Sequence, residues 1–255
     1  MQNPFSRTEL IYGEDAMKKL ASSRVIVFGL GGVGGYVVEA LTRSGIGALD
    51  LVDHDVISES NINRQILATI NTIGRKKVDV AAERVASINP DCQIKTYDVF
   101  FLPDTQDLFD FHDYDYVVDA IDTVTGKLAI IEKAKKEGVP VISAMGAGNK
   151  IDPSAFRVAD LYETSVCPLA RIMRRECKKR GIDSLKVVYS CEKPHRALVE
   201  ERKDSEDSLS DSGQIILGKT DAQARVKQVP GSTAFTPSVA GLILAGEVVN
   251  DLVQS

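Results

Sequence analysis

Three glycines early in the chain have the type and spacing of a phosphate-binding turn. Gly29, Gly31 and Gly34 form the pattern G-x-G-x-x-G within VFGLGGVGG, and Gly32 lies in the same turn. Glycines permit a sharp turn and a close approach of backbone amides to phosphate, and the N-terminus of a following helix favours the anion. The pattern predicts a nucleotide site without separating hydride transfer from phosphate chemistry.

Charged residues further along the chain separate these two chemistries. Asp53 stands where an acidic side chain binds the ribose hydroxyls of either NAD or ATP. Arg64, within NINRQ at residues 61–65, and Lys77 follow it. Cleavage of ATP between its α and β phosphates builds negative charge on pyrophosphate, which fixed cations stabilise. A dehydrogenase has no evident use for two cations at these positions. Asp122 adds an oxygen ligand suited to Mg²⁺, so the set favours adenylyl transfer.

The elements that must position these residues alternate between strands and helices. Apolar β-branched stretches predict strands, and apolar residues at helical spacing predict the helices between them. The predicted strands are residues 24–28, 48–52, 94–100, 116–121 and 139–145, and the predicted helices are 36–43, 75–88, 104–111 and 127–137. This alternation predicts an α/β fold with a Rossmann-like, doubly wound and mostly parallel sheet. Ligands bind such sheets beyond the carboxyl ends of the strands.

The second half of the chain is less regular and predicts an extension of mixed strands and helices. Residues 155–162 and 186–189 are predicted strands around a basic helix at 168–180. Residues 237–252 have helical apolar spacing and predict a packed terminal helix rather than a membrane anchor. We expect one domain over residues 1–255.

Within that domain we expect an ATP-binding core at residues 1–150 and a substrate-facing extension at 151–255. Residues 200–213 are acidic, rich in serine and nearly free of apolar side chains. Such a segment cannot offset the entropy cost of ordering, so it predicts a mobile loop, which we extend over residues 200–225.

Composition limits the classes of function. The 31 Lys and Arg against 36 Asp and Glu give a net charge of −5, so a nucleic-acid site must be a local patch. The N-terminus lacks the pattern of a signal peptide, and no apolar run is long enough to span a bilayer, which favours a cytoplasmic protein. The four cysteines are too widely spaced for C-x-x-C pairs, so we expect free, buried or half-buried thiols and no zinc.

One local basic patch is present on the predicted helix at 168–180. Arg171, Arg174, Arg175 and Lys178 lie at i, i+3, i+4 and i+7, so they form one cationic stripe, with Lys179 at its end. A solvated helix face would have the same pattern. In an acidic protein the concentration of charge favours binding to a nucleic-acid backbone.

The ordered motifs together resemble one protein family. FSRTELIYG, GLGGVGG, LVDHDVISESNINRQ, GRKKV and VVDAIDT, over residues 5 to about 145, are similar to the ubiquitin-activating-like adenylyltransferases, which include the sulfur-carrier adenylating enzymes. The resemblance implies an enzyme that uses Mg-ATP to adenylate a carboxylate. It assigns the ribose to Asp53, the triphosphate to Asn61, Arg64 and Lys77, and Mg²⁺ to Asp122.

The resemblance also implies a homodimer in which Arg7 reaches into the ATP site of the partner. Arg7, Arg64, Lys77 and Asp122 are then the candidate catalytic residues. The candidate nucleotide-binding residues are Gly29, Gly31, Gly32, Gly34, Asp53, Asp55, Asn61, Arg64, Gln65, Lys77 and Asp122.

The later motifs are similar to one branch of that family, the tRNA threonylcarbamoyladenosine dehydratases. CPLARIMRRECKKRGI, VVYSCEKP and PGSTAFTPSVAGLILAGEVV carry this resemblance, and the zinc-binding cysteine pairs of the sulfur-carrier enzymes are missing. The branch implies activation of the threonyl carboxylate on a modified adenosine, followed by ring closure and loss of water. It implies tRNA as the partner, with the 151–255 extension and the basic stripe facing it.

Two alternatives remain at this stage: adenylation of the C-terminal glycine of a ubiquitin-like sulfur carrier, and an NAD-dependent dehydrogenase. The sequence leaves open an oxazolone or a hydantoin product, a monovalent cation, and a sulfur-transfer or cysteine desulfurase partner.

Overall fold

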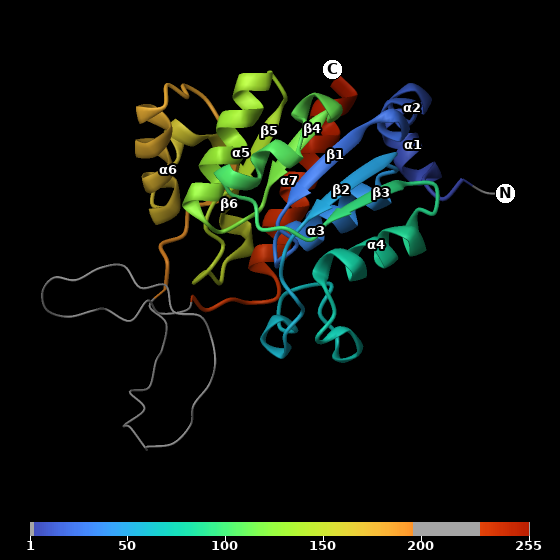
Figure 1. Cartoon of the computed structure of the whole chain (residues 1–255), viewed down its shortest axis with the longest axis horizontal. Coiled ribbons are helices and arrows are strands. Elements are labelled where there is room, and N and C mark those ends of the chain that lie inside the picture. Colours follow the sequence, from blue (N-terminus) through green and yellow to red (C-terminus); the bar gives the residue numbers. More distant parts are fainter. Residues whose placement is uncertain (1–2, 196–229, 255) are drawn as a thin grey trace, which may run out of the picture.

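The computed structural model describes residues 3–195 and 230–254 and contains one seven-stranded sheet (Figure 1). The strands are β1 (Arg24–Phe28), β2 (Ala48–Val52), β3 (Gln93–Tyr97), β4 (Tyr116–Asp119), β5 (Val141–Ala144), β6 (Phe156–Asp160) and β7 (Lys186–Ser190). Their order across the sheet is β3-β2-β1-β4-β5-β7-β6. All neighbours pair in parallel except β6 and β7, which are antiparallel. The predicted doubly wound, mostly parallel sheet is confirmed.

The strand order reverses between β1 and β4, which follow one another across the sheet but not along the chain. In such sheets the chain leaves the two strands toward opposite faces, and a crevice opens beyond their carboxyl ends. Val27 pairs with Leu51 of β2 and with Val118 of β4, so the three strands end nearly level. The segments that follow them, after Phe28, Val52 and Asp119, therefore meet at one edge.

Helices cover both faces of the sheet. The α-helices are α1 (Ser6–Tyr12), α2 (Glu14–Ser22), α3 (Gly34–Arg43), α4 (Lys77–Ile88), α5 (Val124–Glu137), α6 (Pro168–Lys179) and α7 (Thr236–Gln254). The short 3₁₀ helices are Glu59–Asn61, Ile70–Thr72, Pro103–Leu108, Phe111–Asp113, Pro153–Ala155 and Leu161–Glu163. Apolar side chains of α3, α4 and α7 pack in one core cluster, and those of α5 and α6 pack in another.

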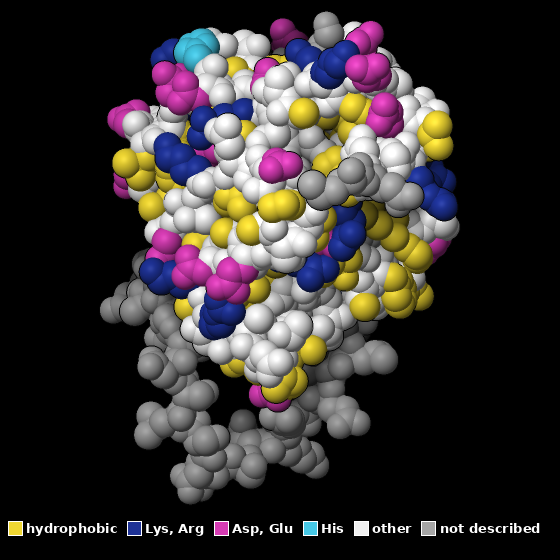
Figure 2. Space-filling model, turned by 90° about the vertical axis from the view of Figure 1, so that its right-hand side faces the viewer, with side chains coloured by type: hydrophobic (Ala, Val, Ile, Leu, Met, Phe, Trp, Pro, Cys, Tyr) yellow, Lys and Arg dark blue, Asp and Glu magenta, His cyan; other side chains and the backbone are white. Residues whose placement is uncertain are grey.

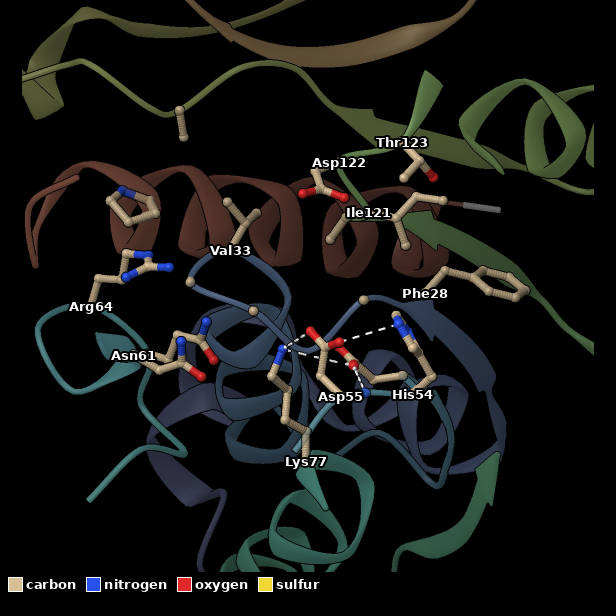
Figure 3. A pocket seen from close by; sticks show the side chains of 18 of the residues that line it. Phe28, Val33, His54, Asp55, Asn61, Arg64, Lys77, Ile121, Asp122 and Thr123 are labelled. Carbon is tan, nitrogen blue, oxygen red and sulfur yellow. Dashed lines mark hydrogen bonds and ion pairs between the residues drawn. The ribbon is translucent and has the colours of Figure 1, made fainter. Parts of the chain in front are cut away.

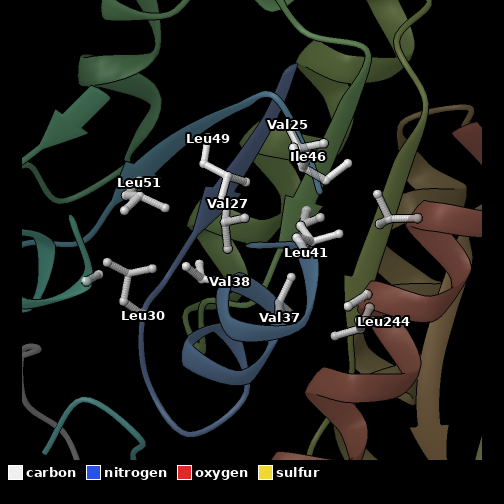
Figure 4. Packing of buried hydrophobic residues seen from close by; sticks show 14 of the residues in the cluster. Val25, Val27, Leu30, Val37, Val38, Leu41, Ile46, Leu49, Leu51 and Leu244 are labelled. Atoms are coloured by element: carbon white, nitrogen blue, oxygen red, sulfur yellow. The ribbon is translucent and has the colours of Figure 1, made fainter. Parts of the chain in front are cut away.

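Alternation along the strands explains these two cores. Val25 and Val27 of β1 belong to the cluster that contains α3 and α7, whereas Ile26 and Phe28 belong to the cluster with α5 and α6. Successive side chains of a strand point to opposite faces, so a strand that is apolar throughout is buried on both. Figure 4 shows the first cluster, in which Leu244 of α7 lies beside the side chains of α3.

The C-terminal helix α7 passes tests of length and apolarity for a membrane span, but it packs in the core. It is the one such helix in the described part of the chain. Ala240, Leu244, Ala245 and Val248 are almost fully buried. A Cβ atom at Gly241 would lie 2.3 Å from the Val33 carbonyl oxygen, so glycine allows α7 to touch the turn before α3. The prediction of a packed terminal helix is confirmed.

Three elements differ from expectation. The N-terminal helices α1 and α2 were not predicted; α1 buries no side chain and α2 buries only Leu20, so neither presents a broad buried apolar stripe. The predicted helix at 104–111 is two short 3₁₀ helices, Pro103–Leu108 and Phe111–Asp113. The predicted loop at 200–225 lies outside the described residues.

Candidate functional site

A cavity of about 440 Å³ opens at the edge where β1, β2 and β4 end (Figure 3). Its walls come from the turn after β1, the loop after β2 and the loop after β4. Every predicted nucleotide-binding residue except Gly34 lines it. The topology therefore brings together residues that are separated by more than 90 positions in the sequence.

The glycine turn forms one wall, and its glycines differ in backbone conformation and in what a side chain at each position would meet. Gly29 has φ +89°, a left-handed conformation that glycine tolerates. A Cβ atom at Gly34 would lie 1.7 Å from the Gly29 carbonyl oxygen, so Gly34 closes the turn instead of lining the cavity. At Gly31 the nearest heavy atom to such a Cβ would be Gln65 Nε2 at 4.0 Å, so space remains open above it.

The same turn presents unused amides. The N–H groups of Gly31, Gly32 and Val33 have no acceptor among the described residues. Val33, the N-cap of α3, offers no side-chain cap, and all three residues line the cavity. Consecutive free amides at a helix N-terminus attract an anion. This wall fits a phosphate group.

The floor of the cavity holds two aspartates and a buried lysine. Asp53 accepts hydrogen bonds from the amides of Leu30 (2.6 Å) and Asp55 (2.8 Å), which fix its carboxylate under the turn. Lys77 Nζ lies 2.6 Å from Asp55 Oδ2 and 3.7 Å from Asp53 Oδ1. His54 packs its ring against Phe100 at 4.4 Å between centroids. His54 also lines the cavity.

The NINRQ motif forms the wall opposite Asp122. Asn61 accepts a hydrogen bond from the amide of Ser58 through Oδ1 (3.1 Å), which leaves its Nδ2 without a partner in the described part. Gln65 is 7% exposed, and its Oε1 has no hydrogen-bond partner among the described residues. An orphaned polar atom in a cavity wall fits a bound ligand. Figure 3 shows Asn61 and Arg64 on the same side of the cavity.

Asp122 differs from the other carboxylates of the cavity. Asp53 and Asp55 are both bonded, whereas the Asp122 carboxylate has no hydrogen bond or ion pair within residues 3–195 and 230–254. It is exposed and faces the cavity in Figure 3. An unpaired carboxylate oxygen is a suitable ligand for Mg²⁺. The residues present therefore fit the ion that the sequence motifs imply.

Asp119, the last residue of β4, has a different environment. Its carboxylate is fully buried and bonds Lys127 Nζ at 3.0 Å and Ser143 Oγ at 2.5 Å. Lys127 Nζ also donates to the Ala144 carbonyl oxygen (2.7 Å). This pair fixes the ends of β4 and β5 and is not available to a ligand.

The model of the ThiF family matches residues 5–255, which is nearly the whole chain. The chain belongs to the ThiF family. The match extends past the glycine turn to α7, so the ThiF fold includes the extension at 151–255.

Within this family, one sequence relative and two solved structures that resemble the chain are tRNA threonylcarbamoyladenosine dehydratases. The tRNA threonylcarbamoyladenosine dehydratase of Bacillus subtilis is 40% identical over 256 residues, which cover 100% of this ThiF chain and 96% of that protein. Two crystal structures of the E. coli tRNA N6-threonylcarbamoyladenosine dehydratase also match. The complex with AMP has a TM-score of 0.83 and the complex with ATP 0.80, each 29% identical and covering 98% of this chain and 94% of the other.

Arg7 lies outside the cavity. It is exposed on α1, and it is not among the residues that line the cavity. The same helix exposes Leu10 (87%) and Ile11 (80%). Figure 2 views the side of the molecule that bears α1 and α2 and shows hydrophobic side chains grouped between charged ones. The structure thus does not bring Arg7 together with the other candidate catalytic residues.

The structure divides the predicted basic stripe of α6 into two groups. Arg171 and Lys178 are exposed and have no ion-pair partner among the described residues. Arg174 turns inward and donates to the hydroxyl and carbonyl oxygens of Thr164. Arg175 and Lys179 pair with Glu176, each at 3.0 Å. The stripe is thus less cationic than the spacing alone predicts.

The cysteines are free, as expected, but not all are buried. Cys92, Cys167 and Cys177 are buried, and Cys191 is exposed, so the expectation of a buried or half-buried thiol is wrong for Cys191. Burial raises the pKa of the Cys92 and Cys177 thiols to about 11, which keeps both protonated near neutral pH. None lines the cavity, so this ThiF site contains no nucleophilic sulfur.

Sequence reasoning missed the far wall of the cavity. Gly148 and the stretch Pro230, Gly231 and Ser232 line it, together with Pro237 at the start of α7. None of them carries a charge. The resemblance in PGSTAFTPSVAG, which begins at residue 230, was the available signal.

Proposed function

We propose that this protein is an ATP-dependent enzyme that dehydrates threonylcarbamoyladenosine in tRNA. The carboxylate of the threonyl group attacks the α phosphate of ATP, and pyrophosphate leaves. The carbamoyl group of the same modified base then attacks the acyl adenylate, a ring closes and AMP leaves. One carboxylate oxygen departs on AMP, so the net change in the RNA is loss of one water. An intramolecular nucleophile needs no enzyme cysteine.

The observation that carries the proposal is the convergence of anion-binding and cation-binding groups in one cavity. Free amides at Gly31–Val33, the guanidinium of Arg64 and the ammonium of Lys77 face the unpaired Asp122 carboxylate across it. The proposed arrangement places the triphosphate between them and the ribose at Asp53. Mg²⁺, held by Asp122, would neutralise charge on the phosphates. The substrate itself is taken from the Bacillus subtilis and E. coli relatives.

The shape of the walls supports the orientation of the nucleotide. Aromatic and aliphatic side chains of Phe28, Val52, Phe100 and Ile121 line the cavity, and Figure 3 shows Phe28 and Ile121 at the end away from Arg64. A purine base fits this apolar end, and the phosphates then lie toward Arg64. The γ phosphate and β phosphate leave as pyrophosphate, and their charge grows as the bond breaks. Fixed cations there favour the transition state over the ground state.

The proposed assembly is a homodimer with shared ATP sites. Arg7 would reach the partner's cavity from α1, whose exposed Leu10 and Ile11 offer an apolar surface to a second chain. The substrate is proposed to approach over the 151–255 extension, with Arg171 and Lys178 toward the RNA. A protein that acts on tRNA is expected in the cytoplasm.

The test is mass spectrometry of tRNA nucleosides after incubation with the purified chain and Mg-ATP. We expect the threonylcarbamoyladenosine mass to fall by one water, with one AMP and one pyrophosphate released for each product. Control reactions contain tRNA without the modification, or a protein that ends in Gly-Gly. Pyrophosphate release with the Gly-Gly protein alone would support the sulfur-carrier alternative. Absence of ATP consumption with modified tRNA would refute the proposal.

A further inference from the structure

A short stretch of chain, residues 230–237, forms part of the cavity wall and packs on two glycines of the site. A Cβ atom at Gly148 would lie 3.0 Å from Pro230, and one at Gly32 would lie 3.3 Å from Pro237. The first glycine follows β5 and the second belongs to the phosphate-binding turn. We call residues 230–237 the bridging segment, because its two ends contact opposite walls of the cavity.

An asparagine holds one end of the bridging segment. Asn149 donates its backbone N–H to the Gly231 carbonyl oxygen (2.7 Å) and accepts the Gly231 N–H through Oδ1 (2.7 Å). It has φ +57°, a left-handed conformation that is uncommon outside glycine but tolerated by asparagine. Both polar groups of Gly231 are thus fixed by one residue.

A second asparagine joins the bridging segment to Arg64. Asn63 donates Nδ2 to the Ser232 carbonyl oxygen (3.1 Å) and accepts Arg64 Nη1 through Oδ1 (2.8 Å). Arg64 only donates and the Ser232 carbonyl only accepts, so these partners fix which end of the amide faces which. A rotation of the amide would break both bonds.

These bonds leave part of the Arg64 guanidinium for a ligand. Nη1 has two acceptors, the Ser60 carbonyl oxygen (2.9 Å) and Asn63 Oδ1. Nη2 and Nε have no acceptor among the described residues. An arginine side chain loses considerable rotamer entropy when it is immobilised. A guanidinium that is already held before ATP binds has lost part of that entropy in advance.

We propose that Asn63 is a positioning residue for Arg64. It holds Arg64 in place by linking it to the bridging segment, which Asn149 anchors. The proposal rests on the proposed function, because it assigns Asn63 a role through the contact of Arg64 with the triphosphate. Asn63 itself does not line the cavity.

The test measures ATP binding and turnover in Asn63→Ala. Loss of a hydrogen bond to a charged group should raise the KM for ATP about tenfold, and the midpoint of thermal unfolding should be unchanged. The control is Asn71→Ala, an exposed asparagine on the neighbouring 3₁₀ helix that does not line the cavity. An unchanged KM in Asn63→Ala would overturn the proposal.

A double-mutant cycle with Arg64→Ala separates this role from others. The dissociation constant of ATP is measured at equilibrium, so the cycle can be read even when turnover is lost. If Asn63 acts through Arg64, Asn63→Ala weakens ATP binding in the wild-type background and has no further effect in Arg64→Ala. Equal losses in both backgrounds would show that Asn63 acts independently and would overturn the proposal.

Asn149→Gly tests the anchor, because glycine keeps the left-handed backbone and removes Oδ1. We expect a smaller rise in the KM for ATP, about threefold, with the thermal midpoint unchanged. No rise would remove Asn149 from the proposal. If Arg64→Ala itself binds and turns over ATP normally, Arg64 does not contact the triphosphate and the positioning role falls with it, whereas a wild-type chain that consumes no ATP with modified tRNA refutes the proposed function. A defective Arg64→Ala with a normal Asn63→Ala refutes only the positioning role.

Discussion

Lys127 and Asp119 form a fully buried ion pair directly beneath the loop that carries Asp122, with Nζ 3.0 Å from Oδ2. Ser143 and the Ala144 carbonyl oxygen complete the hydrogen bonds of the pair. The charges are compensated inside the protein, so the pair is stable only while both partners remain.

Lys127→Met should therefore lower the free energy of unfolding by about 3–5 kcal/mol, because Asp119 would be left buried and unpaired. Urea denaturation at neutral pH measures the change. Lys135→Met, an exposed lysine of the same helix α5, is the matched control and should stay within about 0.5 kcal/mol of wild type. Equal stability of both variants would contradict the buried-pair interpretation.

Arg64→Ala and Asp122→Ala should lose catalysis without losing the fold. Each removes charge from the proposed triphosphate site, and we expect AMP formation to fall about 100- to 1,000-fold. Their far-ultraviolet circular dichroism and thermal midpoints should match wild type, because neither side chain supports the core. Full turnover in either variant would refute its assigned role.

Mixing Arg7→Ala with Arg64→Ala subunits should restore activity if sites are shared. In a mixed dimer, the site that retains Arg64 receives an intact Arg7 from the partner. Random exchange then gives intact sites in about one quarter of the total. Recovery of turnover after subunit exchange is the measurement. An inactive mixture would mean that Arg7 serves its own chain, whereas full activity of Arg7→Ala alone would mean that Arg7 has no catalytic role.

The two exposed cations of α6 should contribute to tRNA binding more than the paired ones. Arg171→Gln with Lys178→Gln should weaken binding and reduce the slope of log K against log salt by about one for each lost phosphate contact. Lys18→Gln with Lys19→Gln, on α2, removes the same charge elsewhere. Equal effects from both double variants would show that only net charge matters.

Glu176 should contribute stability that disappears in acid. Lys179, Arg180 and Arg175 bond its carboxylate and lower its pKa from 4.5 to about 2. Because the folded pKa lies below the unfolded value, this stability is present above pH 4.5 and is lost as the pH falls toward 2. The difference in unfolding free energy between wild type and Glu176→Gln should therefore shrink over that range. A constant difference would contradict the shift.

The sequence indicated which residues meet at the cavity, because these residues follow short, strongly apolar strands. Asp53 and Asp122 come directly after such strands, and parallel strands bring their carboxyl ends together. Each of these predictions used only local pattern and general rules of parallel sheets.

Other features depend on contacts that no local pattern encodes. Lys127 resembles a surface lysine in its sequence context, and only the fold buries it against Asp119. Ser232 approaches Asn63 across 169 positions of sequence. Arg174 shares the spacing of a basic stripe, yet Thr164, from an adjoining loop, turns it inward.

The contact of Gly241 with Val33 has a consequence for biosynthesis. The ribosome makes the glycine turn well before it makes the helix that packs against this turn. While α7 is still inside the ribosome, the apolar face of α3 stays in water. A nascent chain should therefore acquire nucleotide affinity only after α7 has emerged, and chaperones that bind exposed apolar helices should engage it until then.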